Sequence, residues 1–258
     1  MNRYCITYRS SSFLLFLLFL SSLYSCKPAH ERTCFKGAGN SDSLIVELPH
    51  FEKLILGEHM NFILVQDTIE KVRIYGGENL LDHITIDTDG PLELRISNDN
   101  RCRFLRYRKN EINVYIHFKN FNELIYNGSE SLTNEGVLDF IGNNIQITTE
   151  GAAGSIDLNL NAYEIYNLNK VGWSDITLSG QCVLLRSHIF GNQILNATDL
   201  VVDGSINYVS QAGTLSKINA QFIELKVELS GTGDLWYYGF PSEIDKKEYN
   251  SGKLIDKN

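Results

Sequence analysis

Proline and helical periodicity are both scarce in this chain. Its 258 residues include 4 Pro, compared with 20 Gly, 13 Tyr and 13 Phe. Aromatic residues favour strands and glycine favours the tight turns between them, so the composition predicts an all-β protein. Basic residues are also in deficit, with 23 Lys and Arg against 31 Asp and Glu. Nucleic-acid binding depends on cationic side chains that displace counterions from phosphates, so we expect no nucleic-acid partner.

The N-terminus lacks a hydrophobic run long enough to cross a membrane and instead has the features of a leader. The apolar run Phe13–Leu20 has eight residues, whereas a membrane-spanning helix needs about 20. Arg3 and Arg9 precede this run and a small residue precedes Cys26, so residues 1–25 are predicted to be a signal peptide. The ending resembles the lipobox of bacterial lipoproteins, which implies a lipid anchor on Cys26 and an exported protein held at the membrane, most simply the outer membrane. A secretory leader cleaved elsewhere is the alternative.

Patterns of metal, redox and nucleophile chemistry are missing. Cys34, Cys102 and Cys182 match no zinc or thiol-redox spacing. Outside the cytosol they allow one disulfide with a spare thiol, or three buried thiols. The six His residues form no H-x-x-x-H or His/Cys cluster, and the chain has no G-x-S-x-G elbow and no phosphate loop before a helix. We therefore expect no metal and no cofactor.

Short alternating segments follow a polar linker. Residues 26–43 are predicted to be a flexible tether. Residues 44–120 are predicted to be N-terminal strands, because segments of period-2 alternation are separated by glycine-containing turns. Glu78–Leu81 can form a single helical turn. The main predicted strands are Phe62–Val65, Val72–Ile74, Ile84–Ile86, Leu92–Ile96 and Ile112–Phe118.

A basic cluster interrupts these strands at residues 101–109, where five of nine positions are cationic and two are aromatic. Arginine beside aromatic rings suits planar anionic ligands, so the cluster is a candidate contact for an anionic glycan, a lipid headgroup or a partner. The alternative, which we favour, is a solvated loop or edge hairpin whose charges discourage sheet association. The candidate contact residues are Arg101, Arg103, Arg106 and Arg108.

Glycines recur about every 20 residues in the second half of the chain, at successive steps of 23, 21, 19, 22 and 18. Such a period predicts a solenoid in which each coil stacks on its neighbours. We assign residues 121–240 to repeat coils and residues 241–258 to a C-terminal cap or tail, with the aromatic segment Trp236–Pro241 covering the last coil. The clearest corner is Ser230–Asp234. The corner glycines are Gly128, Gly151, Gly172, Gly191, Gly213 and Gly231.

Aspartates near these corners raise the question of catalysis, because glycan-cleaving enzymes need paired carboxylates. We favour the interpretation that each Asp closes its own turn by accepting bonds from backbone N–H groups. A cleft shared by Asp157, Asp175 and Arg186 would favour an enzyme instead. The chain has no D-x-D-x-D-G loop, which argues against calcium. The candidate aspartates are Asp157, Asp175, Asp203 and Asp234.

Several segments together resemble the GIN head domain of auto-transporter adhesins, a family of Gram-negative envelope lipoproteins, over residues 44–254. The resemblance implies that residues 44–258 form one all-β domain, a right-handed parallel β-helix, exported to the cell envelope. The function it implies is that of a non-enzymatic adhesin that binds a glycan or protein on its solenoid face. A polysaccharide lyase or hydrolase on the same scaffold is the alternative. The matching segments are Phe51–Leu54, Phe62–Val65, Gly76–Leu81, Leu92–Leu94, Ser230–Asp234 and Gly239–Pro241.

Overall fold

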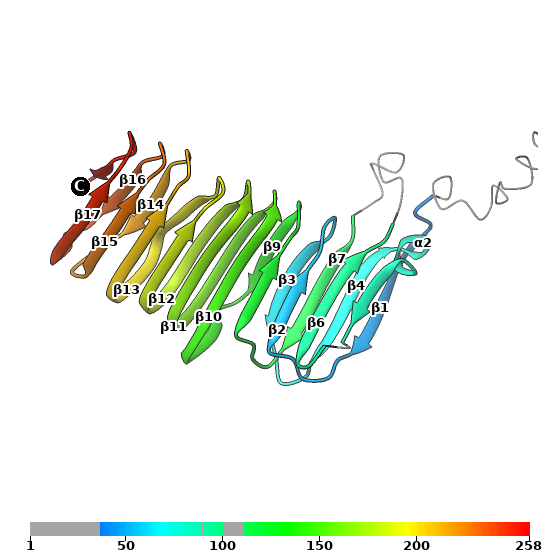
Figure 1. The fold of residues 1–258 in the computed structure, drawn as a ribbon. Helices are drawn as coiled ribbons and strands as arrows, with labels where there is room; N and C mark the ends of the chain where they lie inside the picture. The colour runs from blue at the N-terminus through cyan, green and yellow to red at the C-terminus, as the bar shows by residue number, and fades with distance from the viewer. Residues whose placement is uncertain (1–36, 89, 101–110) are drawn as a thin grey trace, which may run out of the picture.

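The structure, a computed structural model, describes residues 37–88, 90–100 and 111–258. These residues form an elongated stack of strands that runs from β1 (Ser41–Glu47) at one end to β17 (Glu243–Glu248) and β18 (Leu254–Asp256) at the other (Figure 1). Parallel pairing between successive coils builds a solenoid of about seven turns. The predicted all-β parallel β-solenoid with an N-terminal strand region is therefore confirmed.

The N-terminal region alternates short strands with turns and one helical turn. The predicted turn at Glu78–Leu81 is present as α2, and it follows β4 (Lys71–Gly77) directly. Burial alternates along these strands, as the sequence predicts for sheets with one wet face. The other elements are β2 (Lys53–Leu56), β3 (Asn61–Gln66), β5 (Ile84–Asp87), β6 (Glu93–Asn98), β7 (Asn113–Phe118), β8 (Glu123–Tyr126) and β9 (Ser131–Glu135).

The N-terminal strands stack in an order that differs from their order in the chain. β2 pairs in parallel with β6 on one edge and with β8 on the other, so Leu54 lies between Leu94 and Leu124. β3 lies in the same way between β7 and β9. Parallel coils therefore begin well before Asn120, and the expectation that they start there is wrong. Alternation along a strand specifies its buried face but not its partner, so the sequence could not reveal this order.

Antiparallel strands close the N-terminal end of the stack. β4 pairs with β1 and β7, and β5 pairs with β6 as a hairpin. β1 begins at Ser41, so the last three residues of the predicted tether, 41–43, belong to a strand. Ala38, which precedes β1, is also buried, and its carbonyl oxygen accepts a bond from the backbone N–H of Asn79 over 3.0 Å. The end of the predicted tether is thus part of the folded domain.

Longer strands that bend at corners form the C-terminal solenoid. Ile156 pairs with Ile176 one coil away, and Ile176 pairs with Leu195 in the next coil, so the coils repeat at the spacing that the glycines predicted. The strands are β10 (Leu138–Ala152), β11 (Ser155–Gly172), β12 (Asp175–Ile189), β13 (Ile194–Ser210), β14 (Ser216–Asn219), β15 (Glu224–Leu229) and β16 (Leu235–Tyr238).

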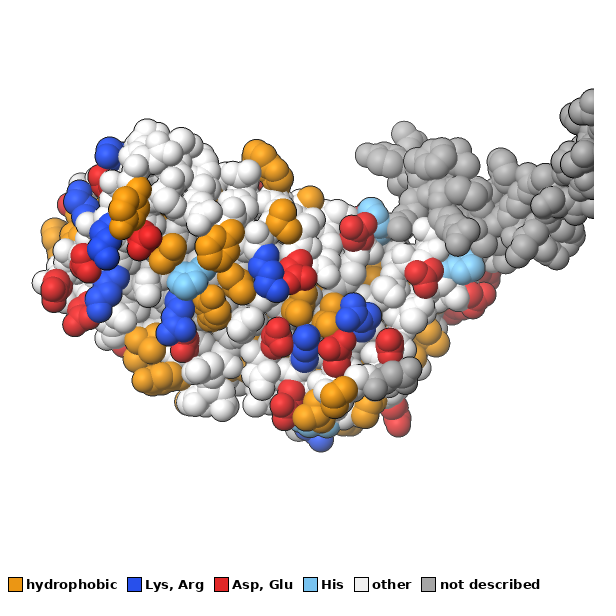
Figure 2. Space-filling model, viewed as in Figure 1, with side chains coloured by type: hydrophobic (Ala, Val, Ile, Leu, Met, Phe, Trp, Pro, Cys, Tyr) orange, Lys and Arg blue, Asp and Glu red, His pale blue; other side chains and the backbone are white. Residues whose placement is uncertain are grey.

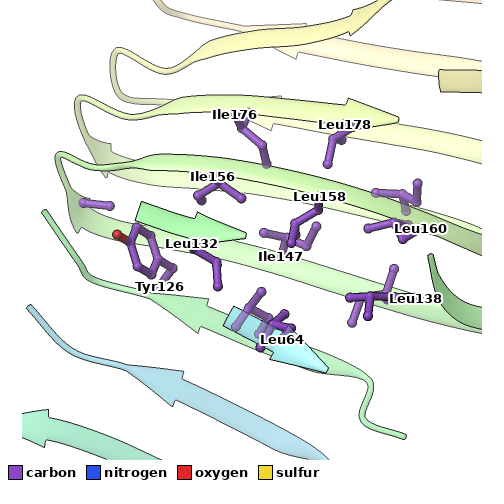
Figure 3. Packing of buried hydrophobic residues seen from close by; sticks show 14 of the residues in the cluster. Leu64, Tyr126, Leu132, Leu138, Ile147, Ile156, Leu158, Leu160, Ile176 and Leu178 are labelled. Atoms are coloured by element: carbon purple, nitrogen blue, oxygen red, sulfur yellow. The ribbon is translucent and has the colours of Figure 1, made fainter. Parts of the chain in front are cut away.

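Aliphatic side chains fill the inside of the solenoid in columns. Leu132, Ile156 and Ile176 occupy equivalent positions in successive coils, and Leu158 lies below Leu178 in the next column (Figure 3). All five are at most 1% exposed. Burying one such side chain stabilises a protein by about 1.5–3 kcal/mol. Because each coil covers the apolar edge of its neighbour, this stabilisation is shared between adjacent coils.

A row of polar side chains is also buried inside the solenoid. The Gln193 amide lies at its centre: its Oε1 accepts a bond from Asn167 Nδ2 over 2.7 Å, and its Nε2 donates to Ser174 Oγ over 3.1 Å and Thr149 Oγ1 over 3.3 Å. Asn169 Nδ2 donates to the same Thr149 hydroxyl over 2.8 Å. Buried amides and hydroxyls are costly unless they form hydrogen bonds, so these bonds favour the register in which the coils stack. Asn167 Oδ1 is the one buried oxygen of this row without a partner among the described residues.

The clearest corner, Ser230–Asp234, differs from its predicted role in one respect. A Cβ on Gly231 would overlap the carbonyl oxygen of Ala212 and would lie 2.5 Å from the carbonyl carbon of Gln211, so glycine is required by the close approach of the previous coil. The expectation that Asp234 closes its own turn is wrong, because Asp234 Oδ1 accepts a bond from the backbone N–H of Lys253 over 2.8 Å. This aspartate joins one coil to the next.

The C-terminal residues form a further coil instead of an aromatic cover. β17 pairs in parallel with β15, and β18 pairs with β16. The Trp236–Tyr238 stretch lies within β16, one coil before the end, which corrects the expectation that this segment covers the last coil. At the open end, Glu248 accepts bonds from the backbone N–H of Leu254 and the ammonium of Lys253, each over 3.0 Å. A charged, hydrogen-bonded end discourages further strand pairing.

Candidate binding groove

An open groove crosses the outer side of the solenoid near its C-terminal end. It has a volume of about 620 Å³, and it is lined by residues of β13, β14 and β16 and of the segments that follow β14, β16 and β18. This volume is in the range of sites that hold small ligands or parts of larger ones. The lining residues are Asn196, Thr198, Lys217, Asn219, Gln221, Tyr238, Gly239, Phe240 and Asn258.

Strand alternation places these side chains on the outside. In β14, Ser216 and Ile218 are buried, so Lys217 and Asn219 point outward. In β16 the same alternation leaves Tyr238 on the outer side. The parallel register then sets Asn219 beside Tyr238 in the next coil. Neighbouring strands of a sheet lie about 4.8 Å apart, so side chains from successive coils form closely spaced rows that can contact one extended ligand.

Amide groups and aromatic rings dominate the lining. Asn and Gln side chains each offer two donors and an acceptor, which suits a ligand rich in hydroxyl groups. Asn258 fixes one wall of the groove, because its Nδ2 donates to the carbonyl of Gly239 over 2.8 Å and its Oδ1 accepts from the Gly239 N–H over 2.7 Å. Gln221 Oε1 accepts from the backbone N–H of Phe240 over 3.1 Å. Phe240 is 65% exposed, so its ring is free to stack on a ligand.

A tryptophan with two cations lies beside this groove. Lys217 pairs with Trp236 in the strand register, and its Nζ is 5.5 Å from the centre of the Trp236 ring. Lys257 Nζ lies 4.1 Å from the same ring. Both distances are typical of cation–π contacts. The Nε1 of Trp236 is buried and has no hydrogen-bond partner among the described residues.

The aspartates singled out in the sequence do not form a catalytic pair. Asp157 and Asp175 are exposed in adjacent coils but two residues out of register, since Asp157 pairs with Thr177. Arg186 lies in the second half of β12, where its Nη1 is 3.2 Å from Glu164 Oε1. Within the described part of the chain, the shared cleft that would favour an enzyme is therefore not formed.

Asp203, like Asp234, bonds to an adjacent coil and does not close its own turn as predicted. Asp203 Oδ2 accepts a bond from Gln181 Nε2 in the preceding coil over 2.6 Å. Among the residues that the structure describes, no group of three or more His, Cys, Asp or Glu side chains is arranged to hold a metal ion. The carboxylates near the corners thus connect coils or remain solvated.

One Ser–His–Glu cluster was not found from the sequence. Ser129 Oγ lies 3.3 Å from His59 Nδ1, but it donates to Glu130 Oε2 over 2.8 Å. Glu130 also accepts from the backbone N–H and Nδ1 of His59, and Glu58 Oε2 lies 3.1 Å from Nε2 of the same ring. With carboxylates at both ring nitrogens, His59 is poorly placed to take a proton from Ser129. The cluster instead holds His59 at its positive φ of 65°, and the 70-residue separation left no local signal.

A half-buried aromatic cluster lies on the second halves of β11 and β12. Tyr166 Oη is 3.1 Å from His188 Nδ1, the two rings meet edge to face at 5.3 Å, and Arg186 lies over the Tyr166 ring. Partial burial, together with the Arg186 charge, lowers the pKa of His188. Phe190 extends the cluster and is 46% exposed. Figure 2 shows hydrophobic side chains gathered near the middle of the solenoid, with acidic and basic side chains intermixed toward its C-terminal end.

Several predicted residues lie outside the described part of the chain. They are Cys26, Cys34, Cys102, Arg101, Arg103, Arg106 and Arg108. Cys182 is described: its thiol is free and buried, and burial raises its pKa to about 12. A thiol with so high a pKa is not a reactive nucleophile near neutral pH. Among the residues with described positions, no helix has the length and apolar character needed to span a membrane.

Comparison with solved structures finds the same fold in proteins of several bacteria. A "putative adhesin" from Bacteroides fragilis has a TM-score of 0.75 and 18% identity, with 86% of this chain and 100% of that chain covered. A "putative adhesin" from Parabacteroides merdae has a TM-score of 0.52 and 13% identity, covering 86% of this chain and 98% of that one. A "putative lipid binding protein" from Parabacteroides distasonis has a TM-score of 0.53 and 16% identity, covering 84% and 97%.

The sequence itself matches one family. A comparison with curated proteins found no similar sequence. The family described as "Putative auto-transporter adhesin, head GIN domain" matches residues 50–241, which include every strand from β2 to β16. This range covers most of the chain and confirms the resemblance expected from the corners and the N-terminal segments. The chain therefore belongs to the family of "putative auto-transporter adhesin, head GIN domain" proteins.

Proposed function

We propose that the protein is a non-enzymatic lipoprotein of the cell envelope that acts as an adhesin by binding a glycan in the groove between β13 and β16. Its membership in a family of adhesins points to a protein of the envelope or cell surface. The single observation that carries the glycan assignment is the lining of the groove, which combines several amide side chains with the exposed ring of Phe240.

Sugars present hydroxyl groups along their edges and C–H groups on their faces. Amides that donate and accept can bond to the hydroxyl groups, and aromatic rings can cover the apolar faces. The groove supplies both on paired strands, and bonds from Asn258 and Gln221 hold the Gly239–Phe240 segment in place. A preorganised site loses less conformational entropy on binding, which favours affinity.

The alternatives fit this lining less well. Glycan cleavage requires carboxylates on both sides of a scissile bond, and none of the described lining residues is an Asp or Glu. One similar structure is described as a lipid-binding protein. An acyl chain, however, requires a continuous apolar pocket, whereas five of the nine lining residues here are Asn, Gln or Thr.

Attachment through Cys26 belongs to the same proposal. The leader and the cysteine in the sequence support it, and a lipid anchor would tether the solenoid to the outer membrane. Growth of the producing cells with a clickable fatty acid should label the wild-type chain and not the Cys26→Ser variant. Equal labelling of the two proteins would rule out this anchor.

A glycan array tests the binding function with the chain from residue 27 onward. We expect Phe240→Ala to remove most of the binding, because stacking on its ring is lost. Tyr249→Ala is a matched control, since Tyr249 is also 65% exposed but does not line the groove. Undiminished binding by Phe240→Ala, or an equal loss in the control, would contradict the placement of the site.

A further inference from the structure

We infer that the groove selects acidic glycans, in which a sugar carboxylate or sulfate is bound by Lys217 and Lys257 beside Trp236. This inference rests on the proposed glycan-binding function and adds the chemical class of the ligand. Three features support it: the cationic charge of the groove, the lack of a carboxylate partner for either lysine among the described residues, and the contacts of both lysines with one indole ring.

The charge of the groove differs from that of the whole chain. The protein has a formal net charge of −8. Among the described residues that line the groove, Lys217 is the one charged side chain, and the others are neutral. A cationic site within an acidic protein attracts an anionic group locally, while the surrounding negative charge repels polyanions that do not fit.

Both lysines lack a carboxylate partner in the part of the chain that the structure describes. Two other lysines in this region are paired: Lys253 lies 3.0 Å and Lys246 lies 3.5 Å from Glu248. Among the described residues, the ammonium groups of Lys217 and Lys257 instead contact the ring of Trp236. Each ammonium therefore keeps its donors free for a ligand.

The carboxylate next to Lys257 in the sequence already accepts hydrogen bonds from other groups. Asp256 precedes Lys257, and its Oδ1 accepts bonds from the backbone N–H and the Nδ2 of Asn258, over 3.0 and 2.7 Å. Hydrogen bonds to Asn258 and to Tyr237 contribute to the lowered pKa of Asp256, with the Asn258 N–H as the main cause. Asp256 thus orders the wall of the groove without neutralising Lys217 or Lys257.

The indole ring holds both cations at one edge of the groove. Cation–π contacts orient the ammonium groups while the lysine stems cover the ring, which limits the rotamer entropy lost on binding. The Nε1 of Trp236 is also buried and has no partner among the described groups. An anionic sugar bound to both lysines would change the surroundings of this indole, so Trp236 is a built-in reporter.

The test uses an array of paired glycans. Each acidic member, which carries a uronic acid, a sialic acid or a sulfate, is matched with the neutral glycan that lacks this group. We expect the chain from residue 27 onward to bind acidic members at least tenfold more tightly, and more weakly as NaCl rises from 0.05 to 0.5 M. Lys217→Gln should reduce this preference about tenfold, the effect of one charge-assisted hydrogen bond. Lys226→Gln, which removes the same charge from a lysine beside Glu224, should leave it unchanged.

The outcomes separate this inference from the function on which it rests. Equal binding of acidic and neutral partners would overturn the acidic selectivity but leave the glycan-binding function in place. Binding of no glycan at millimolar concentration would overturn both.

Fluorescence provides a second readout that does not depend on a loss of folding. Trp173→Phe leaves Trp236 as the single tryptophan. In this variant, the preferred acidic oligosaccharide should shift or quench the emission, and its neutral partner should not. If the acidic ligand binds but the Trp236 emission stays unchanged, the site lies elsewhere and the inference is wrong.

Discussion

The replacement of Gly231 by alanine tests how the coils stack at the clearest corner. A Cβ at this position would overlap the carbonyl oxygen of Ala212 and approach the carbonyl carbon of Gln211 to 2.5 Å. Both obstacles are backbone atoms of the previous coil, so neither can rotate away. The coil that contains residue 231 must therefore shift away from the preceding coil. The φ angle of Gly231 is not in the left-handed region, so the backbone conformation itself would accept alanine.

The size of the effect follows from the bonds that this shift would stretch. At the corner, Ser230 N–H donates to Ser210 over 2.9 Å and Gly233 N–H donates to Ala212 over 2.9 Å. Overpacking costs about 1–3 kcal/mol, and each weakened hydrogen bond adds about 1 kcal/mol. We therefore expect a loss of about 3–5 kcal/mol in the free energy of unfolding, or about 10 °C in Tm for a chain of this size. Valine should cost more than alanine.

Gly213 provides the matched control one coil earlier. A Cβ there would meet the Thr232 hydroxyl at 3.2 Å and Asn192 Oδ1 at 3.9 Å, both of them side-chain atoms. Gly213→Ala should therefore be neutral or stabilise the protein by up to about 1 kcal/mol, through the lower entropy of the unfolded chain. Differential scanning calorimetry and hydrogen exchange of β14–β18 measure the two variants. If Gly231→Ala and Gly213→Ala melt alike, close stacking is not what requires glycine at the corner.

Three other variants test contacts along the solenoid. Gln193→Ala should lower the free energy of unfolding in urea by about 2–4 kcal/mol, because its buried partners lose their bonds; a neutral result would mean that water replaces the amide. Glu130→Ala should speed hydrogen exchange of the His59 backbone N–H and lower the free energy of unfolding by about 1–2 kcal/mol. Unchanged exchange would show that Glu130 does not hold His59 in place. The Leu254 N–H and then the Lys253 ammonium lower the pKa of Glu248 to about 2. The ionised Glu248 carboxylate therefore contributes fully to the free energy of unfolding above pH 4.5, and this contribution is lost as the pH falls toward 2. In the Glu248→Gln variant, the free energy of unfolding should depend less on pH within that window.

The solenoid gives the groove its rigidity. Every lining residue lies on a strand that pairs with its neighbours or on a segment bonded to the adjacent coil. Repeating coils extend a surface without changing its curvature, which suits the recognition of an elongated ligand. The same arrangement spreads stability along the stack, so substitutions in the outward rows should alter binding with little effect on folding.

The sequence by itself determined the fold class, the spacing of the coils, α2 and the inward-facing residues of most strands. These features depend on local patterns: alternation selects the buried face, and glycines about 20 residues apart mark the corners. The family could also be recognised from the sequence, because its corner and segment motifs are short and contiguous.

Only the tertiary structure decided which strands are neighbours and which side chains meet. It placed β2 between β6 and β8, brought Ser129 to His59 across 70 residues, and assembled the groove from four successive coils. It also showed that Gly231 is required by the coil before it and that Asp234 bonds to the coil after it. Each of these contacts joins residues that are distant in the chain, and the free energy that selects the pairing arises only when the coils pack. A local pattern fixes the shape of one coil, whereas the site exists only between coils.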